Sequence, residues 1–182
     1  MDERHCVVGL GVFLESRLRF RADELGGWRT VVMCPAGSES LLADTFRSRY
    51  AFDIFPYRPV ASEDQYRAKL ALANFVDAVE SDDDEILYLD YDHLCRHVIA
   101  LPATDCESLF LSSETVRLPE GDRAFGIELE DCARLSGTHF NTSLILGKRG
   151  VLRTASAGWE LAYTTRLAQF PVRYREEVAF SL

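Results

Sequence analysis

The most informative part of the sequence is EILYLDYDHLCRH, residues 85–97. Its first half is an apolar run with the length and composition of a buried β-strand. Two aspartates, Asp90 and Asp92, follow this run with one tyrosine between them. An isolated buried carboxylate is strongly unfavourable, so these side chains require a metal ion, a cationic partner or exposure at the tip of the strand.

The overall composition is that of an ordinary globular protein. The chain has 182 residues, of which 47% are apolar and 27% are charged, and this length suits a single domain. No apolar run reaches the roughly 20 residues that cross a bilayer, so we expect no membrane span. The net charge of −9 disfavours nucleic acid as a partner, and any anionic ligand must be held by a local device such as a metal ion.

The N-terminus and the cysteines bear on localisation. The first residues, MDERHCVVGLGVF, mix acidic and basic side chains and lack the cleavage site of a signal peptide. The five cysteines are scattered along the chain and form no C-x-x-C pair. Both features predict a cytoplasmic protein with reduced thiols.

Strand-like and helical segments alternate through the first half of the chain. We expect strands at residues 5–13, 29–35, 50–57 and 86–90, and helices at residues 16–25, 38–49 and 62–80. Ser38 is expected to cap one helix, and Ser62 with Gln65 forms a capping box at the start of another. The second half is less regular, with strands expected at residues 108–114, 124–129 and 140–147 and a helix at residues 151–170. The βαβαβ order predicts an α/β fold with a mainly parallel sheet flanked by helices.

The spacing of the two aspartates suits a metal ion. On an extended chain Asp90 and Asp92 point to the same side, at the carboxyl end of their strand, where ligands of such sheets bind. Two carboxylates, completed by water and substrate phosphates, suit Mg²⁺ or Mn²⁺. The alternative is a pair of exposed loop aspartates that cap a following helix.

Several segments resemble one known family. EILYLDYDHLC is similar to the DxD strand of GT-A-fold glycosyltransferases, which bind nucleotide sugars through a divalent metal. QYRAKLALANFV resembles a helix of these enzymes that carries a basic residue toward the donor. LFLSSETVRLPE and HFNTSLILGKRGVL resemble segments of the procollagen glycosyltransferase and lysyl hydroxylase glycosyltransferase domains, and YREEVAFSL resembles their paired-acid segment near the acceptor. The resemblance covers roughly residues 60–182.

The resemblance implies a single GT-A-like domain that transfers sugar from a nucleotide sugar, a UDP-sugar in particular, to an acceptor that the sequence does not identify. Asp90 and Asp92 would hold Mn²⁺ or Mg²⁺ on the diphosphate, and Glu177 or Glu176 would act at the sugar carbon or the acceptor. The residues expected to contact the donor are Lys69, Tyr91, Asn141, Phe13 and Pro35. Phe13 and Pro35 would lie in loops that follow the first strands and hold the nucleoside.

The chain departs from the family pattern in three places. Thr142-Ser143-Leu144 replaces a glycine pair, and the paired aspartates become the longer Glu176 and Glu177. The sequence also ends before the segment that supplies a third metal ligand, often a histidine, in many relatives. The chain could therefore lack a C-terminal segment, or be a non-catalytic protein that binds a nucleotide sugar or a protein partner on the same fold.

Other interpretations of individual residues stay open. Lys69 lies at the edge of an apolar helix face, where a lysine often extends its ammonium to solvent. Asn141 can bind either a sugar hydroxyl or a loop backbone. His93, Cys95 and His97 alternate as zinc ligands do, although no fourth ligand is evident. A haloacid-dehalogenase-like phosphatase would use Asp90 as its nucleophile and would need Lys148, the one lysine downstream.

Overall fold

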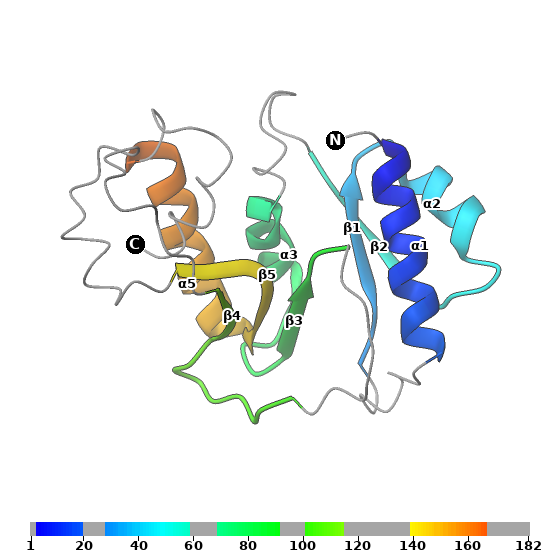
Figure 1. Cartoon of the computed structure of the whole chain (residues 1–182). Coiled ribbons are helices and arrows are strands. Elements are labelled where there is room, and N and C mark those ends of the chain that lie inside the picture. The colour runs from blue at the N-terminus through cyan, green and yellow to red at the C-terminus, as the bar shows by residue number, and fades with distance from the viewer. Residues whose placement is uncertain (1–2, 20–27, 59–68, 92–100, 115–138, 167–182) are drawn as a thin grey trace. The chain divides into compact units, whose positions relative to one another are not determined.

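The computed structural model describes residues 3–19, 28–58, 69–91, 101–114 and 139–166 (Figure 1). The chain divides into two compact units. The first unit comprises Met1–Gln65 and Leu89–Ala103, and the second unit comprises Tyr66–Tyr88 and Thr104–Leu182. Both contain helices and strands, so the α/β class expected from the sequence is confirmed.

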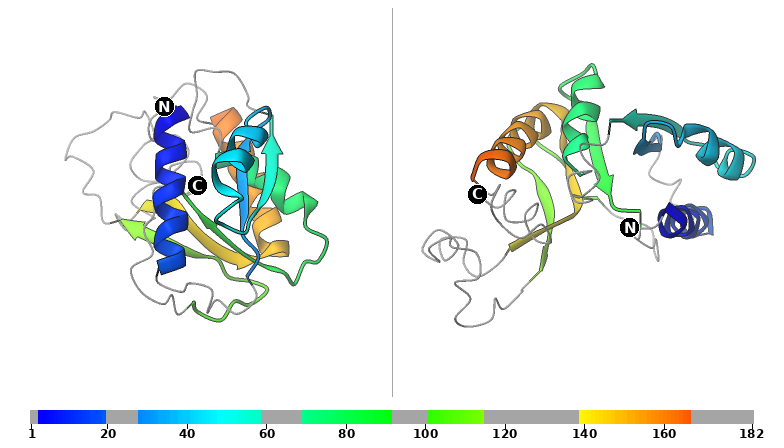
Figure 2. Two further views of the ribbon diagram at one scale, coloured as in Figure 1. Left: turned by 90° about the vertical axis from the view of Figure 1, so that its right-hand side faces the viewer. Right: turned by 90° about the horizontal axis from the view of Figure 1, so that it is seen from above.

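Two helices and two strands form the described part of the first unit. They are α1 (Glu3–Arg19), β1 (Val31–Pro35), α2 (Glu39–Phe46) and β2 (Asp53–Tyr57). The two strands pair in parallel, with Val31 opposite Asp53 and Pro35 opposite Tyr57. Figures 1 and 2 show α1 and α2 beside this pair of strands. A helix connects two parallel neighbouring strands, as the βαβ pattern predicts.

The first expected strand, residues 5–13, is wrong, because these residues belong to α1. Leu10 and Leu14 lie one helical turn apart and are both buried, together with Cys34 of β1 and Leu42 and Phe46 of α2. This one-turn spacing requires a helix that continues beyond residue 13. The apolar run within residues 5–13 is too short to distinguish a strand from a buried helix.

The second unit holds the remaining described elements. A 3₁₀ turn at residues 69–71 leads into α3 (Leu72–Ala78), followed by β3 (Glu85–Leu89), β4 (Phe110–Glu114), β5 (His139–Lys148) and α5 (Arg149–Leu161). A π-helical turn, Ala162–Arg166, extends α5. The chain passes from the second unit to the first at the end of β3, after Tyr88. Each expected strand that falls within the described residues of this half is present, with shifted ends.

The three strands of the second unit form one sheet in the order β3-β5-β4. β4 and β5 pair antiparallel, with Phe110 opposite Leu146 and an irregularity between Leu111 and Ser112. This pairing departs from the mainly parallel sheet that we expected. Alternating apolar residues indicate a strand and its buried face, but they carry no information on the direction of its partner.

The acidic turn before β3 holds the start of α5. The backbone N–H of Arg149 donates to the carbonyl of Asp84 (2.8 Å), and that of Gly150 donates to the carbonyl of Asp82 (3.2 Å). The buried side chain of Arg149 donates to the carbonyl of Val76 in α3 (2.9 Å) and pairs with the Asp82 carboxylate. These bonds satisfy amides that a helix start leaves without intrahelical partners. They explain why α5 begins at Arg149, two residues earlier than expected.

Several expectations lie outside the described residues. They are the strand at 124–129, the capping box at Ser62 and Gln65, and the possible zinc ligands His93, Cys95 and His97. Ser38 does precede α2, but its side chain makes no capping hydrogen bond. The described cysteines, Cys6, Cys34 and Cys106, are free thiols. Among the described helices, none combines the length and apolarity needed to cross a bilayer.

Candidate functional site

Asp90 follows directly after β3, at the end of the strand that the sequence predicted. Ile86 is buried, and the rest of the strand from Leu87 to Leu89 is partly buried, as is Asp90 itself. Asp90 takes part in a polar or electrostatic interaction and is therefore not an isolated surface carboxylate. Asp92 lies outside the described residues, as do Glu176 and Glu177. Within the described ranges, no group of three or more His, Cys, Asp or Glu side chains is placed to hold a metal ion.

Tyr91 packs against the core of the first unit. Its ring lies over Gly9 of α1, and a Cβ atom added at Gly9 would be 2.5 Å from Cδ2 of Tyr91. The same ring borders the cluster that contains Leu10 and Leu14. The segment that follows β3 is thus fixed to α1 at the residue next to Asp90. Gly9 therefore marks a close contact between α1 and the Tyr91 ring.

Lys69 lies in the 3₁₀ turn before α3 and is directed toward β5. Its ammonium donates to the hydroxyl of Thr142, with 3.3 Å between Nζ and Oγ1. Thr142 is fully buried, and Lys69 is partly buried. This contact favours a polar role inside the second unit over an ammonium extended to solvent. Asn141, the neighbour of Thr142 in β5, lies opposite Ser112 of β4.

The two residues expected to lie near the nucleoside have different positions. Phe13 lies within α1, partly buried against the core, so the expectation that it follows a strand is wrong. Pro35 is the last residue of β1 and is exposed. It leads into a turn in which Gly37 has a φ of +102°, a conformation that glycine adopts without strain. Pro35 therefore occupies the carboxyl edge of the parallel pair, where open α/β sheets bind ligands.

Lys148 is engaged away from Asp90. Its ammonium lies 3.2 Å from the Asp83 carboxylate, in the turn that precedes β3. Asp90 follows the other end of the same strand. A phosphatase of the haloacid-dehalogenase type needs its lysine beside the nucleophilic aspartate, and this pairing disfavours that alternative.

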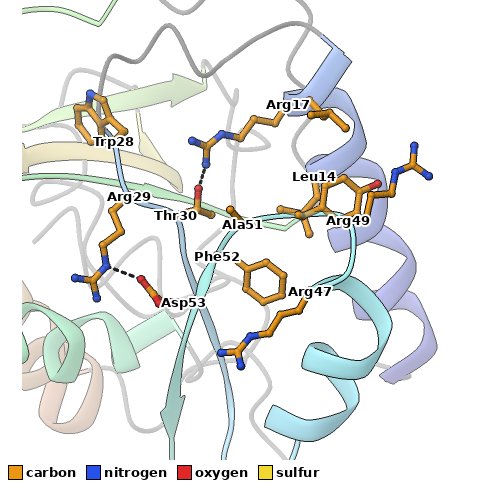
Figure 3. Close-up of a pocket in the computed structure, with 12 residues that line it drawn as sticks. Leu14, Arg17, Trp28, Arg29, Thr30, Arg47, Arg49, Ala51, Phe52 and Asp53 are labelled. Atoms are coloured by element: carbon orange, nitrogen blue, oxygen red, sulfur yellow. Dashed lines mark hydrogen bonds and ion pairs between the residues drawn. The ribbon is translucent and has the colours of Figure 1, made fainter.

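The structure also contains a pocket that the sequence reasoning missed. It occupies about 710 Å³ in the first unit, and Arg17, Arg29, Arg47 and Arg49 are among the residues that line it (Figure 3). The arginines come from α1, from the residues before β1 and from the segment after α2, so no local motif groups all four. The signal for this pocket that the sequence did contain was its composition: nearly all of the lysine and arginine residues are arginines.

Comparison with protein-family models, with curated proteins and with solved structures found no match.

Proposed function

We propose that the protein is a metal-dependent glycosyltransferase that uses a nucleotide sugar, a UDP-sugar in particular, as donor. The observation that carries this proposal is the arrangement of the segments that resemble the family. EILYL forms β3, FLSSE forms β4 and HFNTSLILGK forms β5, and these three strands make one sheet in the order β3-β5-β4. Segments far apart in the sequence are therefore neighbours in space.

The position of Asp90 supports the metal site of this proposal. A carboxylate directly after a strand with a buried residue has the setting that the Asp-x-Asp motif requires. Carboxylate oxygens are suitable ligands for Mg²⁺ or Mn²⁺, so Asp90 and Asp92 fit such an ion by their chemistry. When bound, the ion would supply Lewis-acid stabilisation of charge on the leaving diphosphate.

The chain's own residues have separate roles in this proposal. Asp90 and Asp92 bind the ion, and Tyr91, anchored on α1, limits the freedom of the segment that carries them. Lys69 and Asn141 contribute polar groups on the donor side. Glu177, or its neighbour Glu176, orients the acceptor or stabilises positive charge at the sugar carbon, an interaction that would form mainly in the transition state. The product would be the acceptor with the transferred sugar attached.

Hydrolysis of UDP-sugars in the presence of Mn²⁺ tests the proposal. We expect slow hydrolysis by the parent chain and loss of at least about 100-fold in Asp92→Ala, because the diphosphate would lose its metal. Asp77→Ala is the matched control, since Asp77 is an exposed aspartate of α3. In Glu177→Gln, donor binding should be retained while hydrolysis falls.

Two outcomes would change the proposed metal ligands or the proposed activity. Equal hydrolysis by the parent chain and Asp92→Ala would remove Asp92 from the metal site. Mn²⁺-dependent binding of UDP-sugars without any turnover would instead indicate a protein that binds a nucleotide sugar without transferring it.

A further inference from the structure

The arginine pocket of the first unit holds more basic than acidic side chains among the residues that the structure describes. Four of the described lining residues are arginines, and one, Asp53, is acidic. Arg29 already pairs with Asp53, with 2.7 Å between Nε and Oδ2. Any anion that enters the pocket therefore meets a carboxylate whose charge is already compensated.

Arg49 is also compensated. Its guanidinium lies 2.6 Å from the Glu15 carboxylate and 5.5 Å from the centre of the Tyr50 ring. Glu15 accepts a further hydrogen bond from the Tyr50 hydroxyl (2.7 Å) and pairs with Arg19 (3.1 Å). Arg49 points away from the other three arginines of the pocket in Figure 3.

Arg17 and Arg47 have no acidic partner among the residues that the structure describes. Arg17 donates to the hydroxyl of Thr30, a neutral acceptor that orients the guanidinium without cancelling its charge. The exposed side chain of Arg47, just after α2, has no ion pair or hydrogen bond to any described residue. In Figure 3 the two arginines come from different helical segments, Arg17 from α1 and Arg47 from the end of α2. Two guanidinium groups without acidic partners favour a ligand with several anionic groups over a single phosphate.

Aromatic rings line the same pocket. Tyr50 and Phe52 are engaged elsewhere, since Tyr50 packs against Phe46 (ring centres 6.2 Å apart) and Phe52 borders the core. Trp28 is partly buried and makes no ring contact or hydrogen bond with the other described residues. An indole face beside guanidinium groups is the combination that binds a base together with its phosphates. The net charge of −9 disfavours a long nucleic acid and leaves a small nucleotide as the suitable ligand.

We infer that this pocket binds a nucleoside polyphosphate without a metal ion, with the phosphate chain on Arg17 and Arg47 and the base against Trp28. This binding is additional to the proposed transferase activity. It uses none of Asp90, Asp92 or Lys69, and it persists when divalent metal is removed.

The test is calorimetric titration of the full chain with ATP in the presence of EDTA. We expect saturable binding that weakens about tenfold in Arg17→Gln and in Arg47→Gln, because each variant removes a charge-assisted contact. Arg19→Gln is the matched control: Arg19 lies on the same helix, loses the same charge and does not line the pocket. Circular dichroism checks that every variant is folded.

Two further titrations test the parts of the ligand. AMP should bind at least about tenfold more weakly than ATP, because it offers fewer anionic groups to the two arginines. Trp28→Leu should weaken ATP while leaving inorganic tripolyphosphate unchanged. Asp90→Asn should leave ATP binding in EDTA intact, so failure of the transferase proposal and failure of this one are distinguishable.

The inference is overturned by any of three results. They are the absence of saturable ATP binding, equal weakening in Arg19→Gln, and tripolyphosphate binding as tight as that of ATP. Equal weakening in Arg19→Gln would show that the effect depends only on net charge. Tripolyphosphate binding as tight as that of ATP would show that the base does not contribute to binding.

Discussion

At the scale of single residues, Glu15 links α1 to the segment after α2. Its pKa is lowered chiefly by the hydrogen bond from the Tyr50 hydroxyl, then by the hydrogen bond from Arg19, with a smaller effect from the charge of Arg49. The carboxylate therefore stays ionised in the folded state at a pH where the unfolded chain already takes up a proton. Its contribution to stability is present above the ordinary pKa of 4.5 and is lost as the pH falls through the lower folded value.

This linkage gives a pH-dependent prediction. Unfolding by urea, followed at a series of pH values below about 5, should show a decline in stability that is shallower in Glu15→Gln than in the parent. Asp77→Asn, on an exposed face of α3, is the control for removal of a carboxylate. Parallel curves for the parent and Glu15→Gln would show that the Tyr50 and arginine contacts do not favour the ionised form.

A second residue-scale prediction concerns the contact between Gly9 and Tyr91. Gly9→Ala should destabilise the protein by about 1–3 kcal/mol, because the new methyl group would overlap the Tyr91 ring within a packed core. Gly158→Ala is the matched control in α5, where an added Cβ meets nothing within 4 Å. That variant should gain about 0.5–1 kcal/mol from helix propensity. Thermal unfolding of both variants measures the difference, and equal effects would contradict the packing of Tyr91 on α1.

At the scale of secondary-structure elements, one hydrogen bond joins the turn before α3 to β5. Lys69→Met and Thr142→Val each remove one partner while preserving most of the side-chain volume. A double-mutant cycle in urea should give a coupling of about 0.5–1.5 kcal/mol, the usual net value of such a bond. Additive single effects would mean that Lys69 and Thr142 stabilise the protein independently.

Comparison of the expected with the observed secondary-structure elements shows which of them the sequence could predict. β1, α2, β2, β3 and β5 were all expected, because their apolar residues and flanking turns follow the periods of strands and helices. α1 was assigned as a strand at residues 5–13 followed by a helix at residues 16–25, because the apolar run is too short to distinguish a strand from a buried helix. Its helical period becomes visible only when Leu10 is compared with Leu14. The early start of α5 depends on carbonyls of the distant acidic turn, which no local pattern contains.

At the scale of the whole molecule, the candidate site was predictable only where it depends on one continuous segment. The place of Asp90 after β3 follows from an apolar run and the residue next to it. The pairing of Lys69 with Thr142, and the gathering of arginines in the pocket, bring together side chains from separate elements. Such contacts are set by the tertiary fold and leave no periodic trace in the sequence.

Asp90 and Asp92 are proposed to bind a divalent metal that in turn binds a nucleotide diphosphate. Calorimetric titration of UDP, with Mn²⁺ and then with EDTA, is the decisive experiment for this metal site. We expect a Mn²⁺-dependent component of UDP binding that is absent in Asp92→Ala and retained in Asp77→Ala. UDP binding of the same affinity with Mn²⁺ and with EDTA, unchanged in Asp92→Ala, would contradict the proposed metal site.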